Sequence, residues 1–116
     1  MLMCDLAVSA AGSTLYELCA CGTPAVTYAL ADNQLPGADA FHRAGIMISL
    51  GDIRADMDNP IEKIMESIWV LSGDLSKRKE ISRRMQGVID GNGAKRIVEK
   101  LLSDLFPPPN KNTSTR

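Results

Sequence analysis

The sequence predicts an α/β domain in which about three parallel strands alternate with helices and further helices follow at the C-terminal end. Two observations predict this class. Short strand-like runs alternate with helical segments over residues 5–50, and the loops between them are short, as in βαβ units. From residue 60 onward, apolar residues recur at helical spacing.

Turn and capping residues place the elements of the first half. Gly22 ends the first helix and Pro24 follows it as a stop, while Gly45 ends the second helix. We therefore expect helices over residues 13–21 and 35–44, and strands over residues 5–9, 25–30 and 46–50. So thin a sheet indicates the back half of a larger domain, with an unpaired edge at the first strand.

The second half is predicted to be helical, with helices over residues 60–71, 75–85 and 94–105. Pro60 suits the first turn of its helix. The first of these helices has an apolar face of Ile61, Ile64, Met65, Ile68 and Leu71. The last has an apolar face of Ile97, Val98, Leu101, Leu102 and Leu105. Residues 1–105 therefore form the predicted domain, and residues 106–116 a disordered tail.

Composition limits the classes of function. The chain has 116 residues, so it forms one domain at most, and its net charge of −1 gives no general argument for nucleic acid or membrane binding. Residues 1–66 hold nine acids and three bases, whereas residues 77–100 hold eight bases. We interpret the basic region as solvated helices, because exposed aromatic residues, which RNA-binding faces usually carry, are missing from it.

Cysteine usage and hydropathy point to the cytoplasm. The chain has three cysteines, Cys4, Cys19 and Cys21, and no signal-peptide pattern. An odd number of cysteines in such a chain indicates reduced thiols. Residues 6–31 are rather apolar, but Gly22 and Pro24 interrupt them, so no membrane span is predicted. We predict no cofactor.

The turn between the first strand and the first helix is the most informative segment. Gly12 permits close backbone approach, and the hydroxyl groups of Ser13 and Thr14 lie at the expected helix start. Free backbone N–H groups and the positive helix end would make this turn an anion site. The alternative is an ordinary helix cap with tight packing between helix and strand.

Polar residues on two neighbouring elements extend this candidate site. Asn33 and Gln34 follow the second strand, so they should share the carboxyl-end rim of the sheet with the Gly12 turn. Their amide groups both donate and accept, which suits sugar hydroxyls. Glu17, in the first turns of an otherwise apolar helix, could accept hydrogen bonds from a ribose. The alternative for Asn33 and Gln34 is a polar loop that caps the next helix. The alternative for Glu17 is an acid that faces solvent.

Other chemistry-bearing residues are given structural roles. His42 is the single histidine and has no visible catalytic partner, so we expect it to be structural or on the surface. Asp52, Asp56 and Asp58 form a loose acidic loop that lacks the glycine and terminal glutamate of a calcium site. No metal site and no catalytic residue are therefore predicted.

A family resemblance rests on two motifs in order. The run Ser-Ala-Ala-Gly-Ser-Thr-Leu-Tyr-Glu-Leu-Cys-Ala-Cys-Gly-Thr-Pro, followed by Leu-Ala-Asp-Asn-Gln, resembles the nucleotide-binding half of GT-B enzymes. The similarity is closest to the PseG/SpsG group, UDP-sugar hydrolases of the pseudaminic acid pathway and their spore-coat polysaccharide relatives. The segment from Arg84 to Ile97 also resembles the closing segment of that group, and the whole resemblance covers residues 4–102.

The resemblance implies a partial Rossmann-like GT-B C-terminal domain that binds a UDP-sugar. It places the pyrophosphate on Gly12, Ser13 and Thr14, the ribose on Glu17, and the sugar or diphosphate on Asn33 and Gln34. A comparable Glu and Gln pair serves the donor in MurG-like glycosyltransferases, so the donor-binding half of a transferase is an alternative.

The chain departs from the family in one large respect. Family members carry an N-terminal domain with a glycine-rich loop and a catalytic histidine, and nothing here matches that loop. The resemblance therefore implies a fragment, a truncated product or one subunit of a split enzyme, inactive alone and paired with a separate N-terminal-domain chain. A non-catalytic interaction module that forms a homodimer through its exposed sheet edge is a further alternative.

Overall fold

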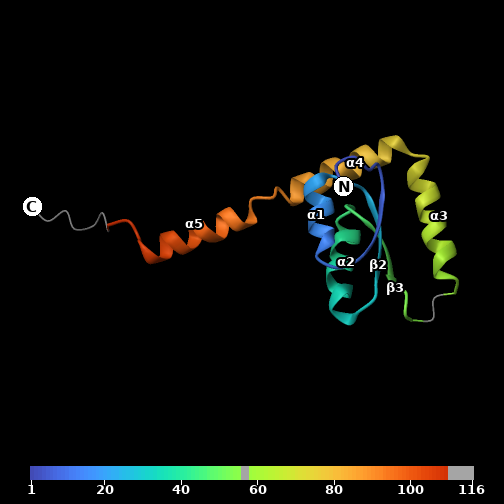
Figure 1. Cartoon of the computed structure of the whole chain (residues 1–116), viewed down its shortest axis with the longest axis horizontal. Coiled ribbons are helices and arrows are strands. Elements are labelled where there is room, and N and C mark those ends of the chain that lie inside the picture. The colour runs from blue at the N-terminus through green and yellow to red at the C-terminus, as the bar shows by residue number, and fades with distance from the viewer. Residues whose placement is uncertain (56–57, 110–116) are drawn as a thin grey trace, which may run out of the picture.

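The α/β class with parallel strands and C-terminal helices is confirmed. The structure is a computed structural model that describes residues 1–55 and 58–109. Within these ranges the order is β1 (Ala7–Ala10), α1 (Thr14–Cys21), β2 (Ala25–Ala29), a 3₁₀ turn (Asp32–Gln34), α2 (Leu35–Arg43), β3 (Ile48–Asp52), α3 (Pro60–Ser72), α4 (Leu75–Val88) and α5 (Gly93–Leu105) (Figure 1). The arrangement is consistent with part of a Rossmann-like domain. Of the predicted tail at residues 106–116, residues 106–109 are exposed and follow the last helix, and residues 110–116 lie outside the described residues.

The sheet of the described residues is parallel, with β2 between β1 and β3. Ala7 pairs with Ala25, and Thr27 pairs with Ser49. The register shifts between Thr27 and Ala29, opposite the segment in which Gly51 has a φ of +76°. β1 is thus an edge strand, as the sequence predicted.

Two predicted strands are displaced toward the C-terminus. β1 begins at Ala7 instead of residue 5, because its partner β2 begins only at Ala25, just after Pro24. β3 begins at Ile48 instead of residue 46. The reason is that Ile46 belongs to the end of α2, where its N–H donates to the Phe41 carbonyl at 3.1 Å, as in a helix-ending glycine motif.

Helices cover both faces of the sheet. Figure 1 shows α1 and α2 on one side, α3 on the other and α4 across one end. The core is continuous from the sheet to α4. Its fully buried apolar side chains include Leu15, Leu18, Cys19, Val26, Ile46, Leu71 and Met85.

The predicted apolar faces of α3 and α5 are only partly buried. In α3, Leu71 is buried and Ile68 packs against the core, but Ile61 and Met65 are exposed. In α5 no side chain is buried. Helical periodicity identifies an apolar stripe but not the surface that covers it. For this reason the sequence did not predict that part of the α3 face and the whole α5 face are exposed. None of the helices in the described part of the chain combines the length and apolar character needed to cross a bilayer.

Replacing Gly22 by alanine is expected to destabilise the fold by about 1–2 kcal/mol, the cost of a left-handed conformation for a residue with a Cβ. Gly22 ends α1 with a φ of 66°, and a Cβ there would lie 2.6 Å from Ser82 Oγ. Urea unfolding measures the change. Gly87→Ala is the matched control: a Cβ at Gly87, inside α4, meets nothing within 4 Å, so it should stabilise by about 0.5–1 kcal/mol. Equal effects at both positions would contradict this account.

Candidate functional site

The loops after β1 and β2 meet at one hollow on the carboxyl-end rim of the sheet. The hollow has a volume of about 280 Å³. It brings together four of the six residues that the sequence predicts for the site: Gly12, Ser13, Asn33 and Gln34. The remaining lining comes from Ala11, Leu15, Tyr16, Gly37 and Phe41.

The start of α1 presents free backbone donors beside this hollow. The N–H of Gly12 donates to Ala10 O, and that of Leu15 donates to Gly12 O at 3.2 Å. Among the hydrogen bonds of residues 1–55 and 58–109, the N–H groups of Ser13 and Thr14 have no acceptor. The Ser13 side chain makes no capping bond to the helix. The helix end therefore offers two unused amides and a hydroxyl where its dipole is positive.

Gln34 turns a donor toward the same place. Its Oε1 accepts a hydrogen bond from Leu30 N–H at 2.8 Å, which fixes the orientation of the amide. Its Nε2 lies 3.9 Å from the point that a Cβ on Gly12 would occupy. Because the carbonyl oxygen is already engaged, the side chain offers N–H groups to the hollow. Donors from α1 and from the loop after β2 thus converge, which suits an anionic or hydroxyl-rich ligand.

An aromatic pair that the sequence analysis missed forms one wall. The rings of Tyr16 and Phe41 are 5.5 Å apart between centroids and meet edge to face at 75°. Aromatic residues make up only 4% of the chain, and this scarcity is the signal that could have drawn attention to them. The pair adds an apolar part to the lining of the hollow.

Two predicted site residues lie outside the lining. Thr14 is half-buried at the first position of α1, and it contributes its backbone N–H rather than a lining side chain. Glu17 is exposed on the same helix, one turn further along. Within the lining set there is no acid, no histidine and no basic residue. The described lining therefore lacks the carboxylate, imidazole and ammonium groups that most often act as general acids and bases.

Arg54 ties the loop after β2 to the end of β3. Its Nη2 contacts the carboxylates of Asp32 and Asp52, and its Nε donates to Asp52 Oδ1 at 2.9 Å. This contact neutralises the acid that directly precedes Asn33. It also explains the pKa of Asp52, which hydrogen bonds from Arg54 lower from 3.8 to about 2. In the predicted acidic loop, Asp56 lies outside the described residues.

The replacement Arg54→Gln is expected to raise the pKa of Asp52 from about 2 part of the way toward 3.8, because the side-chain bond is lost while the backbone N–H of residue 54 still donates to the carboxylate. Interactions that lower the pKa of a carboxyl group stabilise the folded state at pH values above the pKa of the unfolded chain. This stabilisation is lost as the pH falls through the pKa of the folded state. The Asp52 contribution should therefore disappear between pH 3.8 and about pH 2. A carboxyl NMR titration measures the midpoint. Arg43→Gln, which removes the partner of Asp39 instead, should leave Asp52 unchanged; a midpoint insensitive to Arg54 would refute the assignment.

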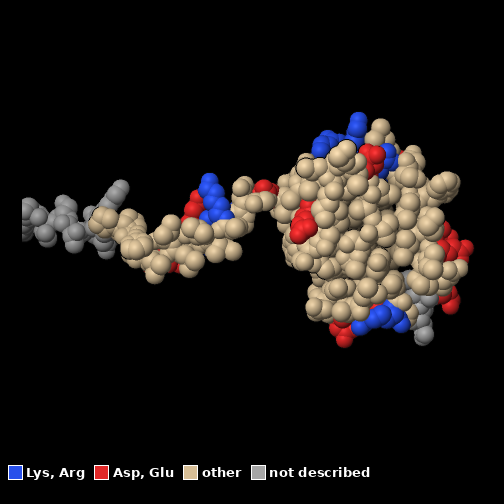
Figure 2. All heavy atoms as spheres, viewed as in Figure 1, with Lys and Arg blue, Asp and Glu red and all other residues tan. Residues whose placement is uncertain are grey.

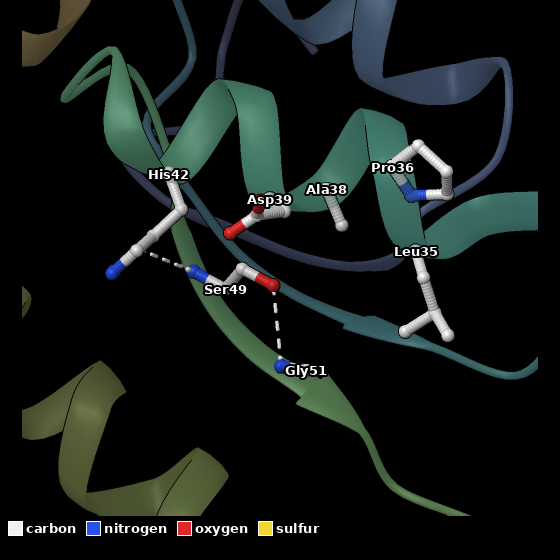
Figure 3. A pocket seen from close by; sticks show the side chains of 7 residues that line it. All are labelled: Leu35, Pro36, Ala38, Asp39, His42, Ser49 and Gly51. Atoms are coloured by element: carbon white, nitrogen blue, oxygen red, sulfur yellow. Dashed lines mark hydrogen bonds between the residues drawn. The ribbon is translucent and has the colours of Figure 1, made fainter.

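His42 has a structural contact, as expected from the sequence. Its Nδ1 accepts a hydrogen bond from Ser49 N–H at 3.1 Å, and Ser49 Oγ accepts one from Gly51 N–H at 3.2 Å (Figure 3). The two side chains cover outward N–H groups of the edge strand β3, which protects that edge from pairing. Figure 3 also shows Asp39 beside them, in a separate hollow of about 440 Å³.

Burial makes one of the three cysteines a poor nucleophile. Cys19 is buried, and burial raises the pKa of its thiol to about 11, so it stays protonated at neutral pH. Across the described ranges, no group of three or more His, Cys, Asp or Glu is placed to hold a metal ion.

The chain matches no family model, no curated protein and no solved structure.

Proposed function

We propose that this chain is the UDP-sugar-binding half of a PseG-like nucleotide-sugar hydrolase that works in the cytoplasm on cell-surface polysaccharide precursors. One observation supports this most directly. The two segments that resemble the family, around Gly12 and around Gln34, line the same hollow. They lie more than twenty residues apart in the sequence, and both bring hydrogen-bond donors to it.

In this proposal the diphosphate lies over the start of α1. The free N–H groups of Ser13 and Thr14 donate to its oxygens, with the Ser13 hydroxyl and Gln34 Nε2 beside them. Such a helix start is suited to phosphate because its donors and its dipole point at the same place. Fixed donors of this kind also stabilise the charge that develops on a departing diphosphate.

The remaining lining suits the sugar and nucleoside. Asn33 offers an amide that can both donate to and accept from hydroxyl groups. The Tyr16 and Phe41 wall gives the apolar face of a ring a surface to pack against. The resemblance assigns the ribose to Glu17, which is exposed on α1 outside the lining of the hollow, so the ribose would extend from the hollow toward that carboxylate.

The hydrolytic step requires a base that this hollow does not provide. Water would lose a proton to a general base as it attacks either the anomeric carbon, with UDP as the leaving group, or the phosphorus that carries the sugar, with the sugar as the leaving group. The described lining of the hollow has no carboxylate, imidazole or amine to take that proton. We therefore assign the base to the N-terminal domain that the family resemblance implies, with the residues described here binding the substrate and stabilising the charge on its diphosphate.

Isothermal titration of the full chain with UDP, UMP and uridine tests the binding proposal. We expect UDP to bind more tightly than UMP, and uridine to bind most weakly, because the donors at α1 recognise the diphosphate. No heat of binding with millimolar UDP, or equal affinity for uridine and UDP, would refute the proposal. A transferase half would bind the same donor, and release of free sugar in the presence of the N-terminal-domain chain distinguishes the hydrolase.

A further inference from the structure

The apolar face of α5 has no partner within its own chain. All five residues of its predicted face are more than half exposed, from 52% at Leu102 to 70% at Leu105. The helix has 13 residues and extends away from the body (Figure 1). Isolated helices of this length are marginal in water, so a stable α5 needs a surface that covers this face.

A matching surface exists on α3. Ile61, Met65 and Trp69 form a row at i, i+4 and i+8, with exposures of 71%, 56% and 80%. Glu62 and Glu66 flank this row on one side, and together with Met65 and Trp69 they line an apolar groove of about 340 Å³. Figure 2 shows acidic side chains along the right-hand edge of the body, over α3.

The rows on the two helices have the same spacing and length. Ile97, Leu101 and Leu105 repeat the i, i+4, i+8 pattern of the α3 row. At about 1.5 Å per residue, each row is about 12 Å long. Rows at i±4 are the ridges that interdigitate in the commonest class of helix packing, so the two rows are suited to pack against each other.

The charges beside the rows specify a parallel arrangement. On α3, Glu62 and Glu66 each follow a residue of the row by one position, whereas on α5, Arg96 and Lys100 each precede one. At 3.6 residues per turn, the acids and the bases therefore flank their rows on opposite sides. When two parallel helices face each other, these opposite sides meet, so bases oppose acids. In the isolated chain, Arg96 and Lys100 contact Asp90 and Asp104 at exposed positions, where such pairs are weak.

The other side of the interface is apolar in the same arrangement. Val98 and Leu102 of α5 then face Ile64 and Ile68 of α3, which are half-buried against the body. In the parallel arrangement, charged pairs therefore form at one flank of the interface and aliphatic contacts form at the other. An antiparallel arrangement would instead place the aliphatic pair Val98 and Leu102 against the two glutamates.

The α3 of the same chain is out of reach. α3 joins the beginning of α4, whereas α5 follows its end, and the 14 residues of α4 span about 21 Å. The segment 89–92 between α4 and α5 has four residues and spans at most about 14 Å. Figure 1 shows α3 and α5 at opposite sides of the body. A parallel contact with the first turn of the same chain's α3 would require a still longer link.

We propose that α5 of each chain docks in parallel on α3 of a second copy, and that the two contacts form a reciprocal dimer. Each chain both donates an α5 and receives one, as a two-fold interface requires. The interface leaves the hollow at Gly12 and Gln34 free, because it uses neither α1 nor the loop after β2.

Analytical ultracentrifugation of the full chain tests this proposal. We expect a dimer that either Leu101→Asp or Met65→Asp converts to a monomer. Ser103→Asp and Lys63→Asp are matched controls: each residue is exposed and lies two positions from Leu101 or Met65, on the far side of the same helix. Both should leave the dimer intact. Circular dichroism checks that each variant is folded.

Mixing the two monomeric variants gives the sharpest outcome. The Leu101→Asp chain keeps an intact α3 row, and the Met65→Asp chain keeps an intact α5, so a mixture should recover a heterodimer with one of the two contacts. A wild-type chain that stays monomeric at all concentrations overturns the proposal. A dimer that Met65→Asp leaves intact also overturns it, because α5 would then pair with something other than α3.

Discussion

Replacing Ser13 by aspartate is expected to weaken UDP binding on the order of tenfold or more, since like charges placed together cost several kcal/mol and each 1.4 kcal/mol is a factor of ten. Ser13 is exposed at the start of α1 and lines the hollow. An aspartate there occupies the positive helix end with its own carboxylate and repels the diphosphate. Isothermal titration measures the loss.

The fold should be unaffected by this change, because aspartate is a favourable residue at the start of a helix. Ser13→Asn is the matched control, since asparagine has the shape of aspartate without its charge and caps helices equally well. We expect Ser13→Asn to bind UDP within a few fold of wild type. Equal loss in both variants would show that shape rather than charge matters at this position and would argue against a diphosphate there.

Replacing Leu71 by alanine is expected to destabilise the chain by about 2–5 kcal/mol, the usual cost of truncating a fully buried leucine. Leu71 has no exposed surface and is the buried side chain of α3. Its carbonyl also accepts a hydrogen bond from Arg78 Nη1 at 2.6 Å, which joins the end of α3 to α4. Since domains of this kind are stable by only about 5–15 kcal/mol, the loss is a large fraction of the total.

Urea unfolding measures this loss, and the neighbouring residue provides the control. Val70 is 60% exposed on the same turn of α3. Val70→Ala should therefore change the free energy of unfolding by less than about 0.5 kcal/mol. A loss below about 1 kcal/mol for Leu71→Ala would mean that α3 is not anchored through this side chain.

The order of strands and helices could be predicted because local signals agree with it. Gly22 and Gly45 end helices where the sequence predicted, and β2 begins directly after Pro24. The ends of β1 and β3 could not be predicted, because they depend on the partner strand and on the hydrogen bond that places Ile46 at the end of α2. The residue pattern of one strand records neither where its partner strand begins nor which hydrogen bonds its first residues make.

The site could be predicted in part. Parallel strands end at a common rim, and this rule brought Gly12 and Ser13 together with Asn33 and Gln34. The Tyr16 and Phe41 wall was missed because it forms between two helices whose relative rotation is a property of the packing. The exposed α3 and α5 rows were expected to be ordinary apolar faces for the same reason: periodicity does not name a partner.

The amide NMR spectrum of the labelled chain during titration with UDP tests the central claim most directly. We predict that the backbone signals of Ser13 and Thr14 and the side-chain amide signals of Asn33 and Gln34 shift together as UDP is added. Signals around His42 and Ser49, which line the separate hollow, should not move. Shifts confined to that second hollow, or no shift of the Ser13 and Thr14 amides at millimolar UDP, would contradict the claim that the Gly12 turn binds a UDP diphosphate.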